Sequence, residues 1–207
     1  MTNTISRRER EKLRHRGEIL DAAEAVFAEK GFHRTTVDDI AARSEFAVGT
    51  IYNFFSSKDE LYRILIEDRF RLLRDNVTMS MAQADGPVET IKAFIDTKIQ
   101  LSRKYIGFAR LYTRERLGDR FTESKLWWET VAPYHDEVMD QLTQTFKEGI
   151  EQGCFRNDIE PADMTTALDG LTEAFMFEWF MFPEKTSFLD KFEVMVRLFF
   201  EGVKKRG

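Results

Sequence analysis

The sequence has little of what marks secreted, membrane-embedded or disulfide-linked proteins. It contains one cysteine in 207 residues, so no internal disulfide can form and a reducing compartment is expected. No run of 18 or more apolar residues could span a bilayer. The basic N-terminus also leads into no apolar segment of the kind found in secretory signals. These features predict a cytoplasmic protein with no membrane partner.

Glycine and proline are also scarce, with 11 and 4 residues. The longest segments repeat apolar residues at a period near 3.6, and no convincing period-two alternation is present. The sequence therefore predicts an all-α fold of about nine helices. The expected helices are 17–30, one capped by Thr35 or Thr36, one over 47–55, a long one from Lys58, and then 88–106, 107–117, 123–152 (interrupted or kinked near Pro133), 161–182 and 187–205.

Metal and catalytic chemistry find no support in the sequence. His15, His33 and His135 lie far apart with no second ligand at metal spacing. There is no Ser/His/Asp or Cys/His set and no phosphate-binding loop. We therefore expect no metal, no cofactor and no catalytic residue. A small helical enzyme, or an interaction module that uses the aromatic C-terminal part, is the alternative function.

The net charge of −5 is distributed unevenly along the chain. Residues 1–16 hold six Arg and Lys against two Glu, a balance of +4, whereas the chain from Asp59 onward holds 21 basic and 27 acidic residues. A basic segment on an acidic chain suits binding to nucleic-acid phosphates. Arg7, Arg8 and Arg10 are the predicted phosphate-binding charges of this N-terminal arm.

A helix, a short bend and a second helix are expected between residues 36 and 55, which is the helix-turn-helix pattern. The inner face of this pair would consist of Ile40, Ala41, Ile51 and Phe55. The outward residues would then be Val48, Gly49, Thr50, Tyr52 and Asn53. In this motif the second helix lies in the major groove, where such side chains can meet base edges, methyl groups and phosphates. No basic residue stands between Arg43 and Lys58, so attraction to phosphate would come from Lys58, helix N-termini and the arm.

Several segments of this region agree in one register with a known signature: Gly31-Phe32, Thr35-Thr36-Val37, Ile40-Ala41, Gly49-Thr50-Ile51-Tyr52, Phe55 and Lys58-Asp59-Glu60-Leu61. Over about residues 15–65 they resemble the N-terminus of the TetR family of one-component transcriptional regulators. The resemblance implies a DNA-binding domain over 1–57 and a ligand-binding and dimerisation domain over 58–207. The phosphate contacts it implies are Thr36, Tyr52 and Lys58, and the groove-facing residues are Ala47, Val48, Gly49, Thr50 and Asn53. Glu45 stands where the family turn usually has glycine, and a positive φ there would cost on the order of 1 kcal/mol.

The C-terminal part is rich in aromatic residues and methionine, most of which we expect in the core. Two apolar stripes near the chain end can pack on their copies as a four-helix interface of a homodimer. The predicted interface residues are Leu168, Leu171, Phe175, Trp179, Phe192, Met195 and Phe199. The remaining faces are predicted to line a cavity for a small apolar or aromatic effector, with Arg110, Arg114 or Arg116 available for an acidic end. The candidate cavity residues, each of which could equally be plain core, are Phe108, Tyr112, Trp127, Trp128, Tyr134 and Met176.

The resemblance therefore implies a ligand-responsive regulator, most often a repressor, that binds a palindromic DNA operator as a dimer. Ligand binding would favour a conformation in which the two DNA-binding domains no longer match the operator.

Overall fold

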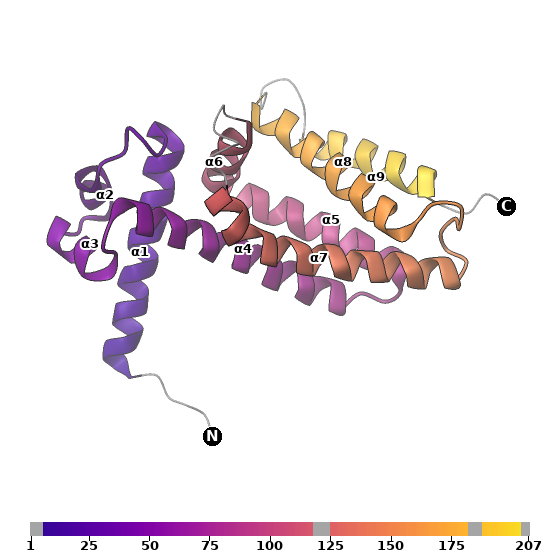
Figure 1. Cartoon of the computed structure of the whole chain (residues 1–207), viewed down its shortest axis with the longest axis horizontal. Coiled ribbons are helices and arrows are strands. Elements are labelled where there is room, and N and C mark those ends of the chain that lie inside the picture. The colour runs from indigo at the N-terminus through magenta and orange to yellow at the C-terminus, as the bar shows by residue number, and fades with distance from the viewer. Residues whose placement is uncertain (1–5, 118–124, 182–187, 204–207) are drawn as a thin grey trace. The chain divides into compact units, whose positions relative to one another are not determined.

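The computed structural model describes residues 6–117, 125–181 and 188–203, and the side chains of these residues outside 112–128 and 181–191. Nine helices form the regular structure of the described residues, which confirms the predicted all-α fold (Figure 1). They are α1 (Arg7–Lys30), α2 (Val37–Ser44), α3 (Val48–Phe54), α4 (Lys58–Ala82), α5 (Pro87–Lys104), α6 (Ile106–Leu117), α7 (Lys125–Glu151), α8 (Pro161–Met181) and α9 (Phe188–Val203).

The chain divides into two compact units, which we call the head and the body. The head comprises Met1–Arg69 with Ile106–Phe121, and the body comprises Phe70–Tyr105 with Thr122–Gly207. This division differs from the predicted boundary after residue 57, because the first half of α4 and all of α6 belong to the head. The difference arises because α6 packs against α1, and because Glu24 of α1 binds both Arg69 of α4 and the backbone N–H of Phe108 on α6.

Helix α1 begins ten residues earlier than the expected start at Gly17, which corrects that prediction. A capping box explains the early start: the Ser6 hydroxyl accepts the N–H of Glu9, and the Glu9 carboxylate accepts the N–H of Ser6. At the other end Gly31, with φ 77°, closes the helix through its N–H to the Phe27 carbonyl. The polar residues before Gly17 have no apolar period, so the capping pair was the available signal for this segment.

The core of the head lies where α1, α2, α3 and the first half of α4 meet. Its fully or almost fully buried side chains are Ile19, Ala23, Phe27, Ile40, Ile51, Phe55, Leu61 and Leu65. The ring of Tyr62 stands edge-on to Phe27 with ring centres 5.1 Å apart, and it also meets Phe32 at 4.8 Å. Truncating a buried ring such as Phe27 to alanine typically costs about 3–5 kcal/mol. The short helices α2 and α3 are therefore held by packing more than by their own length.

In the body, α5, α7, α8 and α9 run side by side (Figure 1), with α7 in contact with both α5 and α8, and α8 in contact with α9. Their inward side chains include Ile91, Phe94, Ile95, Leu142, Phe146, Met164, Leu168, Met195 and Phe199. Helix α7 continues through Pro133, so the predicted interruption is wrong. Val131 and Val138, on either side of the proline, are buried, and this packing outweighs the loss of one backbone hydrogen bond.

The segment that follows α7 packs against this helix at Gly149. A Cβ on Gly149 would lie 2.2 Å from the ring of Phe155, which is buried against Phe146 with ring centres 5.4 Å apart. The next residue, Arg156, donates its backbone N–H to the carbonyl of Val203 and so holds the end of α9. A residue with no side chain is therefore required at this point of α7.

Candidate nucleic-acid interface

The bend between α2 and α3 contains one residue in the left-handed conformation. Glu45 ends α2 with φ 59° and ψ 22°, and its N–H donates to the carbonyl of Ala41. The N–H of Phe46 donates to the same oxygen at 3.2 Å. Among the described non-glycine residues, Glu45 alone has a positive φ. The position thus keeps the backbone conformation for which glycine is best suited.

Helix α3 presents one face to the core and the other to solvent, as its sequence predicts. Ile51 and Phe55 are each 1 % exposed, whereas Tyr52 is 52 % exposed. The other outward residues are exposed or half-buried, namely Ala47, Val48, Gly49, Thr50 and Asn53. The two buried anchors fix the rotation of α3 about its axis. The outward side chains are therefore presented together on a short, rigid helix.

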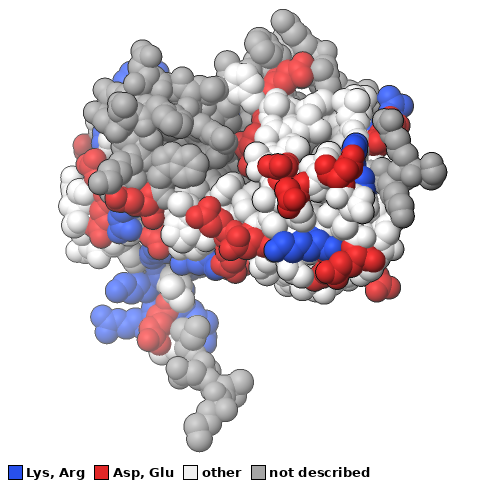
Figure 2. Space-filling model, turned by 45° about the vertical axis from the view of Figure 1, so that its right-hand side comes forward, with Lys and Arg blue, Asp and Glu red and all other residues white. Residues whose placement is uncertain are grey.

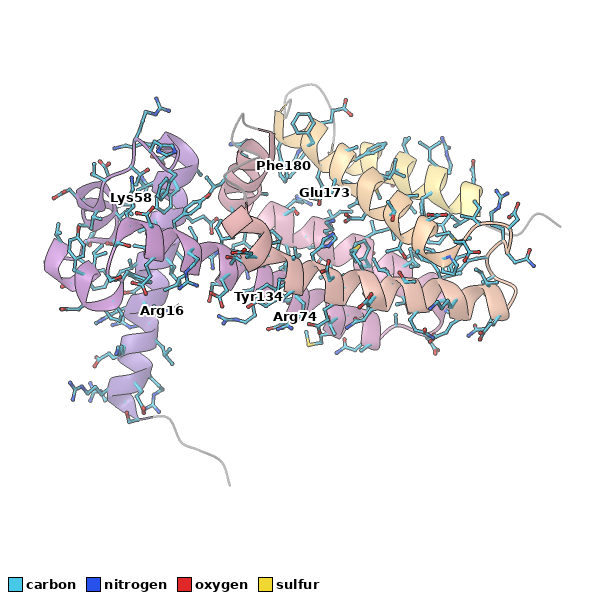
Figure 3. The ribbon with its side chains drawn as sticks, viewed as in Figure 1. Arg16, Lys58, Arg74, Tyr134, Glu173 and Phe180 are labelled. Atoms are coloured by element: carbon cyan, nitrogen blue, oxygen red, sulfur yellow. The ribbon has the colours of Figure 1, made fainter. Side chains whose placement is uncertain are left out.

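The two predicted phosphate contacts beside this helix already make internal contacts. The Thr36 oxygen accepts the N–H of Asp39 at 3.1 Å as the cap of α2, which leaves its hydroxyl hydrogen for an outside acceptor. Lys58 donates to the carbonyls of Phe32 at 2.9 Å and Thr35 at 2.8 Å, and its ammonium lies 4.4 Å from the centre of the Phe32 ring. Lys58 (Figure 3) thus ties α4 to the segment before α2, and one of its three donors is left for a phosphate.

The basic residues predicted as an arm instead lie on the first turns of α1. Arg7, Arg8 and Arg10 are exposed, and Figure 2 shows blue side chains gathered along this end of the molecule. On a helix these charges keep fixed spacings, whereas a flexible arm would spread them. A surface of this kind attracts phosphate without reading sequence.

Arg16, which belongs to the basic segment 1–16 but is not among its three predicted contacts, links this basic surface to the DNA-reading helix α3. Its guanidinium lies 5.9 Å from the centre of the Phe55 ring, just after the end of α3 (Figure 3). In the sequence it stands at the end of the basic run, three residues before Ile19, the first buried apolar residue of α1. The basic segment of α1 is thereby fixed relative to α3 within the head.

A buried charge cluster joins three helices of the body and was not found from the sequence. Lys98 of α5, 9 % exposed, donates to Asp169 at 2.8 Å and Glu173 at 2.9 Å, both on α8 (Figure 3 labels Glu173). His135 of α7 meets the other oxygen of Asp169 at 3.4 Å. The signal was a lysine in register with the buried Ile91 and Ile95 on one face of α5.

The charges of this cluster shift one another's pKa values. Burial alone would lower the pKa of Lys98, but the carboxylates of Glu173 and Asp169 raise it above its ordinary value. Burial alone would raise the pKa of Asp169, and Lys98 and His135 hold it well below its usual range. The bond to Asp169 raises the pKa of His135. His135 also meets the exposed carboxylate of Asp136 at 3.3 Å, so this histidine lies between two acidic side chains.

The predicted effector-binding residues lie in different surroundings. Phe108 is buried in the head, and Met176 is buried in the body, where its sulfur accepts from the Ser102 hydroxyl at 3.5 Å. Tyr134 is half-buried, and the guanidinium of Arg74 lies 5.3 Å from its ring centre (Figure 3). Arg74 also binds Glu137 at 2.6 Å, so Tyr134 belongs to an ion-pair cluster. Tyr112, Trp127 and Trp128 lie outside the residues whose side chains are described.

The predicted dimer residues divide into two groups. Four have almost no surface left for a partner, because they are buried within the chain itself: Leu168, Phe192, Met195 and Phe199. Three are half-buried on α8, namely Leu171, Phe175 and Trp179. The exposed apolar residues on α9 are Val194, 39 % exposed, and Leu198, 54 % exposed. The apolar stripe of α9 therefore packs within its own subunit, and Val194 and Leu198 lie outside the predicted stripe.

Comparison with known proteins decides the family. The model described as "Bacterial regulatory proteins, tetR family" matches residues 19–64. The HTH-type transcriptional regulator YfiR of Bacillus subtilis is 39 % identical over 155 residues, which cover 70 % of each chain. The chain belongs to the TetR family. This protein is therefore a TetR-family transcriptional regulator, and the rival assignment of a small enzyme falls away because its relatives are regulators.

One further relative and one solved structure are similar to this TetR-family chain. The HTH-type transcriptional repressor KstR2 of Mycobacterium tuberculosis is 28 % identical over 149 residues, covering 70 % of this chain and 71 % of the relative. The solved structure of FadR from Bacillus subtilis in complex with stearoyl-CoA has the same fold, with a TM-score of 0.77 and 20 % identity. That match covers 90 % of this chain and 98 % of FadR.

The described part of this TetR-family chain has neither a membrane-spanning helix nor a metal-binding group of side chains. No helix there is long and apolar enough to cross a membrane. No three His, Cys, Asp or Glu side chains there gather so as to hold a metal ion.

Proposed function

We propose that this regulator is a homodimeric repressor that binds a palindromic operator through α3 and leaves it when the body binds an apolar effector. The observation that carries the proposal is the outward face of α3, held in place by the buried Ile51 and Phe55. The chain also resembles KstR2, whose name describes a repressor.

The DNA-binding mode combines two kinds of contact. Thr50 and Asn53 supply hydrogen bonds to base edges, and Ala47 supplies a methyl contact, in a major groove wide enough for a helix. The basic surface of α1 supplies attraction that does not depend on sequence. Two heads placed about 34–36 Å apart, one helical turn of DNA, would match two half-sites of a palindrome.

The affinity of the protein for DNA upstream of its own gene, measured at several salt concentrations, tests this combination of base and phosphate contacts. Replacing Arg7, Arg8 and Arg10 by alanine should weaken binding to every sequence and lower the salt slope by up to about 3, since each phosphate contact contributes roughly 0.9. Asn53→Ala should instead change the preferred sequence at one position of each half-site, by about 1–3 kcal/mol. Equal effects of the two variants on all sequences would contradict the division of roles.

Gly49 offers a test of how closely α3 approaches DNA. A Cβ there meets nothing within 4 Å, so Gly49→Ala should leave folding unchanged. If the backbone of α3 lies against the DNA, the same substitution should weaken operator binding at least tenfold. Unchanged affinity would mean that α3 sits higher in the groove than we propose.

For the dimer interface, we propose an apolar surface of α8 and α9 that comprises the half-buried Leu171 and Phe175 and the exposed Val194 and Leu198. Ordinary protein interfaces need about 600–1,000 Å² from each partner, which two long helices can provide. Leu198→Glu should produce monomers in analytical ultracentrifugation and lower operator affinity. Met79→Glu is the matched control, because Met79 is 56 % exposed on α4 and lies outside the proposed surface. If both variants stay dimeric, the interface lies elsewhere.

For the effector, we propose a molecule with a long or bulky apolar part. Support comes from the FadR structure of the same fold, which was solved with stearoyl-CoA. Release of operator DNA by stearoyl-CoA, compared with coenzyme A and stearate alone, is the first test. Release by coenzyme A without its acyl chain would contradict an apolar effector.

A further inference from the structure

The carboxylate of Glu24, on α1, holds two other helices of the head at once. One oxygen accepts from Nε of Arg69, on α4, at 2.6 Å. The other oxygen accepts from the backbone N–H of Phe108, on α6, at 3.1 Å. The Glu24 side chain is 11 % exposed and that of Arg69 is 7 % exposed, so both charges are largely withdrawn from water. A buried carboxylate with two charge-assisted or dipolar donors is a strong and specific contact.

Arg69 adds a second attachment to α1. Its Nη2 binds Asp21 at 2.5 Å, one turn before Glu24, and its Nη1 lies 3.4 Å from Asp68. Asp21 differs from Glu24 in two ways: its side chain is 70 % exposed, and among the described residues it binds Arg69 of α4 and no residue of α6. These four head residues, Asp21, Glu24, Arg69 and Phe108, are called the Glu24 junction below.

On α6, Glu24 serves as a cap supplied by another helix. The N–H of Phe108 is in the first turn of α6, where backbone donors have no acceptor within the helix. A carboxylate at this end also interacts favourably with the helix dipole. The approach is close: a Cβ on Gly107 would lie 3.2 Å from the Glu24 oxygen and 3.6 Å from Cβ of Ala28.

The Glu24 junction lies beside two points at which the chain passes between head and body. One passage is between Arg69 and Phe70, and the other is between Tyr105 and Ile106. Arg69 is therefore the last head residue before one passage, and Phe108 is the third after the other. A displacement of the body that pulls on α4 or α6 acts directly on a bond to Glu24.

We propose that the Glu24 junction couples the body to the DNA-binding surface. This inference rests on the proposed function, in which effector binding in the body weakens DNA binding by the head. Because the Glu24 carboxylate binds both α4 and α6, a shift of either helix weakens its own bond to Glu24 and changes the bond to the other helix. Either change alters how α1 is attached to α4 and α6. Helix α1 carries the basic surface, and its Arg16 lies over Phe55 at the end of α3. Glu24 is a positioning residue, acting on DNA through α1.

The decisive variants are Glu24→Gln and its matched control Asp21→Asn. Glu24→Gln keeps the shape of the side chain but removes the charge shared by α4 and α6. Asp21→Asn weakens a bond to the same arginine without touching α6. Hydrogen–deuterium exchange of the segment 106–111 is measured for the full-length protein with and without operator DNA. By reciprocity of coupling, DNA bound at the head must change the stability of the α6 attachment.

We expect operator DNA to slow exchange in this segment at least fivefold in the wild type and in Asp21→Asn, and to leave it unchanged in Glu24→Gln. In a parallel assay, saturating stearoyl-CoA should weaken operator binding by about 5–150-fold in the wild type, the usual range of such coupling, and by less than twofold in Glu24→Gln. Arg69→Lys keeps the positive charge but cannot bind Asp21 and Glu24 through separate nitrogens as the guanidinium does. It should give changes in exchange and operator affinity between those of the wild type and Glu24→Gln, and it replaces Glu24→Gln in the test if that variant does not fold.

The outcomes separate the two proposals. A wild-type protein that binds no DNA overturns the proposed function, and the coupling with it. A wild-type protein that binds DNA with no change in exchange at 106–111 overturns the coupling alone. The coupling is also overturned if Glu24→Gln or Arg69→Lys folds and responds as fully as the wild type.

Discussion

Replacing Glu45 by glycine should stabilise the protein, because this residue holds a backbone conformation that a side chain disfavours. At φ 59° and ψ 22° the Cβ of Glu45 costs about 1–2 kcal/mol. Glycine removes that cost but makes the unfolded chain more flexible, which opposes folding by about 0.5–1 kcal/mol. The net gain for Glu45→Gly is therefore about 0.5–1 kcal/mol. In a chain of this size each kcal/mol raises Tm by about 2–4 °C, so the expected rise is about 1–4 °C.

Thermal unfolding by circular dichroism measures the effect, with Glu45→Ala as the control. Alanine removes the carboxylate but keeps a Cβ in the left-handed conformation, so it should give no gain in Tm. Both variants remove one negative charge from the DNA-binding head, and both should raise affinity for any DNA sequence by a similar factor. Equal melting temperatures for the glycine and alanine variants would refute the argument from backbone strain.

Two further predictions concern the body. Gly149→Ala should lower the free energy of unfolding by about 1–3 kcal/mol, because its Cβ would overlap the buried ring of Phe155. Gly170→Ala is the control and should not lower it, because a Cβ at Gly170 meets nothing within 4 Å. Equal urea midpoints for the two variants would contradict the predicted clash. The bond to Asp169 raises the pKa of His135 in the folded protein above its usual 6.5. The protonated histidine therefore stabilises the fold fully below pH 6.5, and this stabilisation is lost as the pH rises through the higher pKa of the folded state. Urea unfolding at pH 6 and pH 8 should therefore show a smaller loss of stability across this interval in His135→Gln than in the wild type, and an identical loss would exclude this histidine as the cause.

The features predicted correctly from the sequence depend on residues close together along the chain. Thr36 and Asp39 form the capping box of α2, and both lie within one helical turn. The buried anchors of α3, Ile51 and Phe55, follow from helical spacing alone. The capping pair at the start of α1 was equally local, and it was overlooked because no apolar period accompanied it.

Contacts between distant residues carried no such signal. Glu24 meets Arg69 across 45 positions and Phe108 across 84. Lys98 could be recognised as an odd residue on an apolar face, but its partner Asp169 lies 71 positions away. A sequence shows that a buried charge needs a partner, yet many carboxylates are available in this chain, and packing selects which one it meets.

The sequence by itself determined the helices, the outward face of α3 and the family, because helical period, capping and the spacing of a short motif are local properties. Tertiary structure alone decided that α4 and α6 join the head at Glu24, and that the apolar stripe of α9 faces its own subunit. The reason is physical: an amphipathic helix specifies which of its faces is buried, whereas the surface that buries it depends on how the rest of the chain packs.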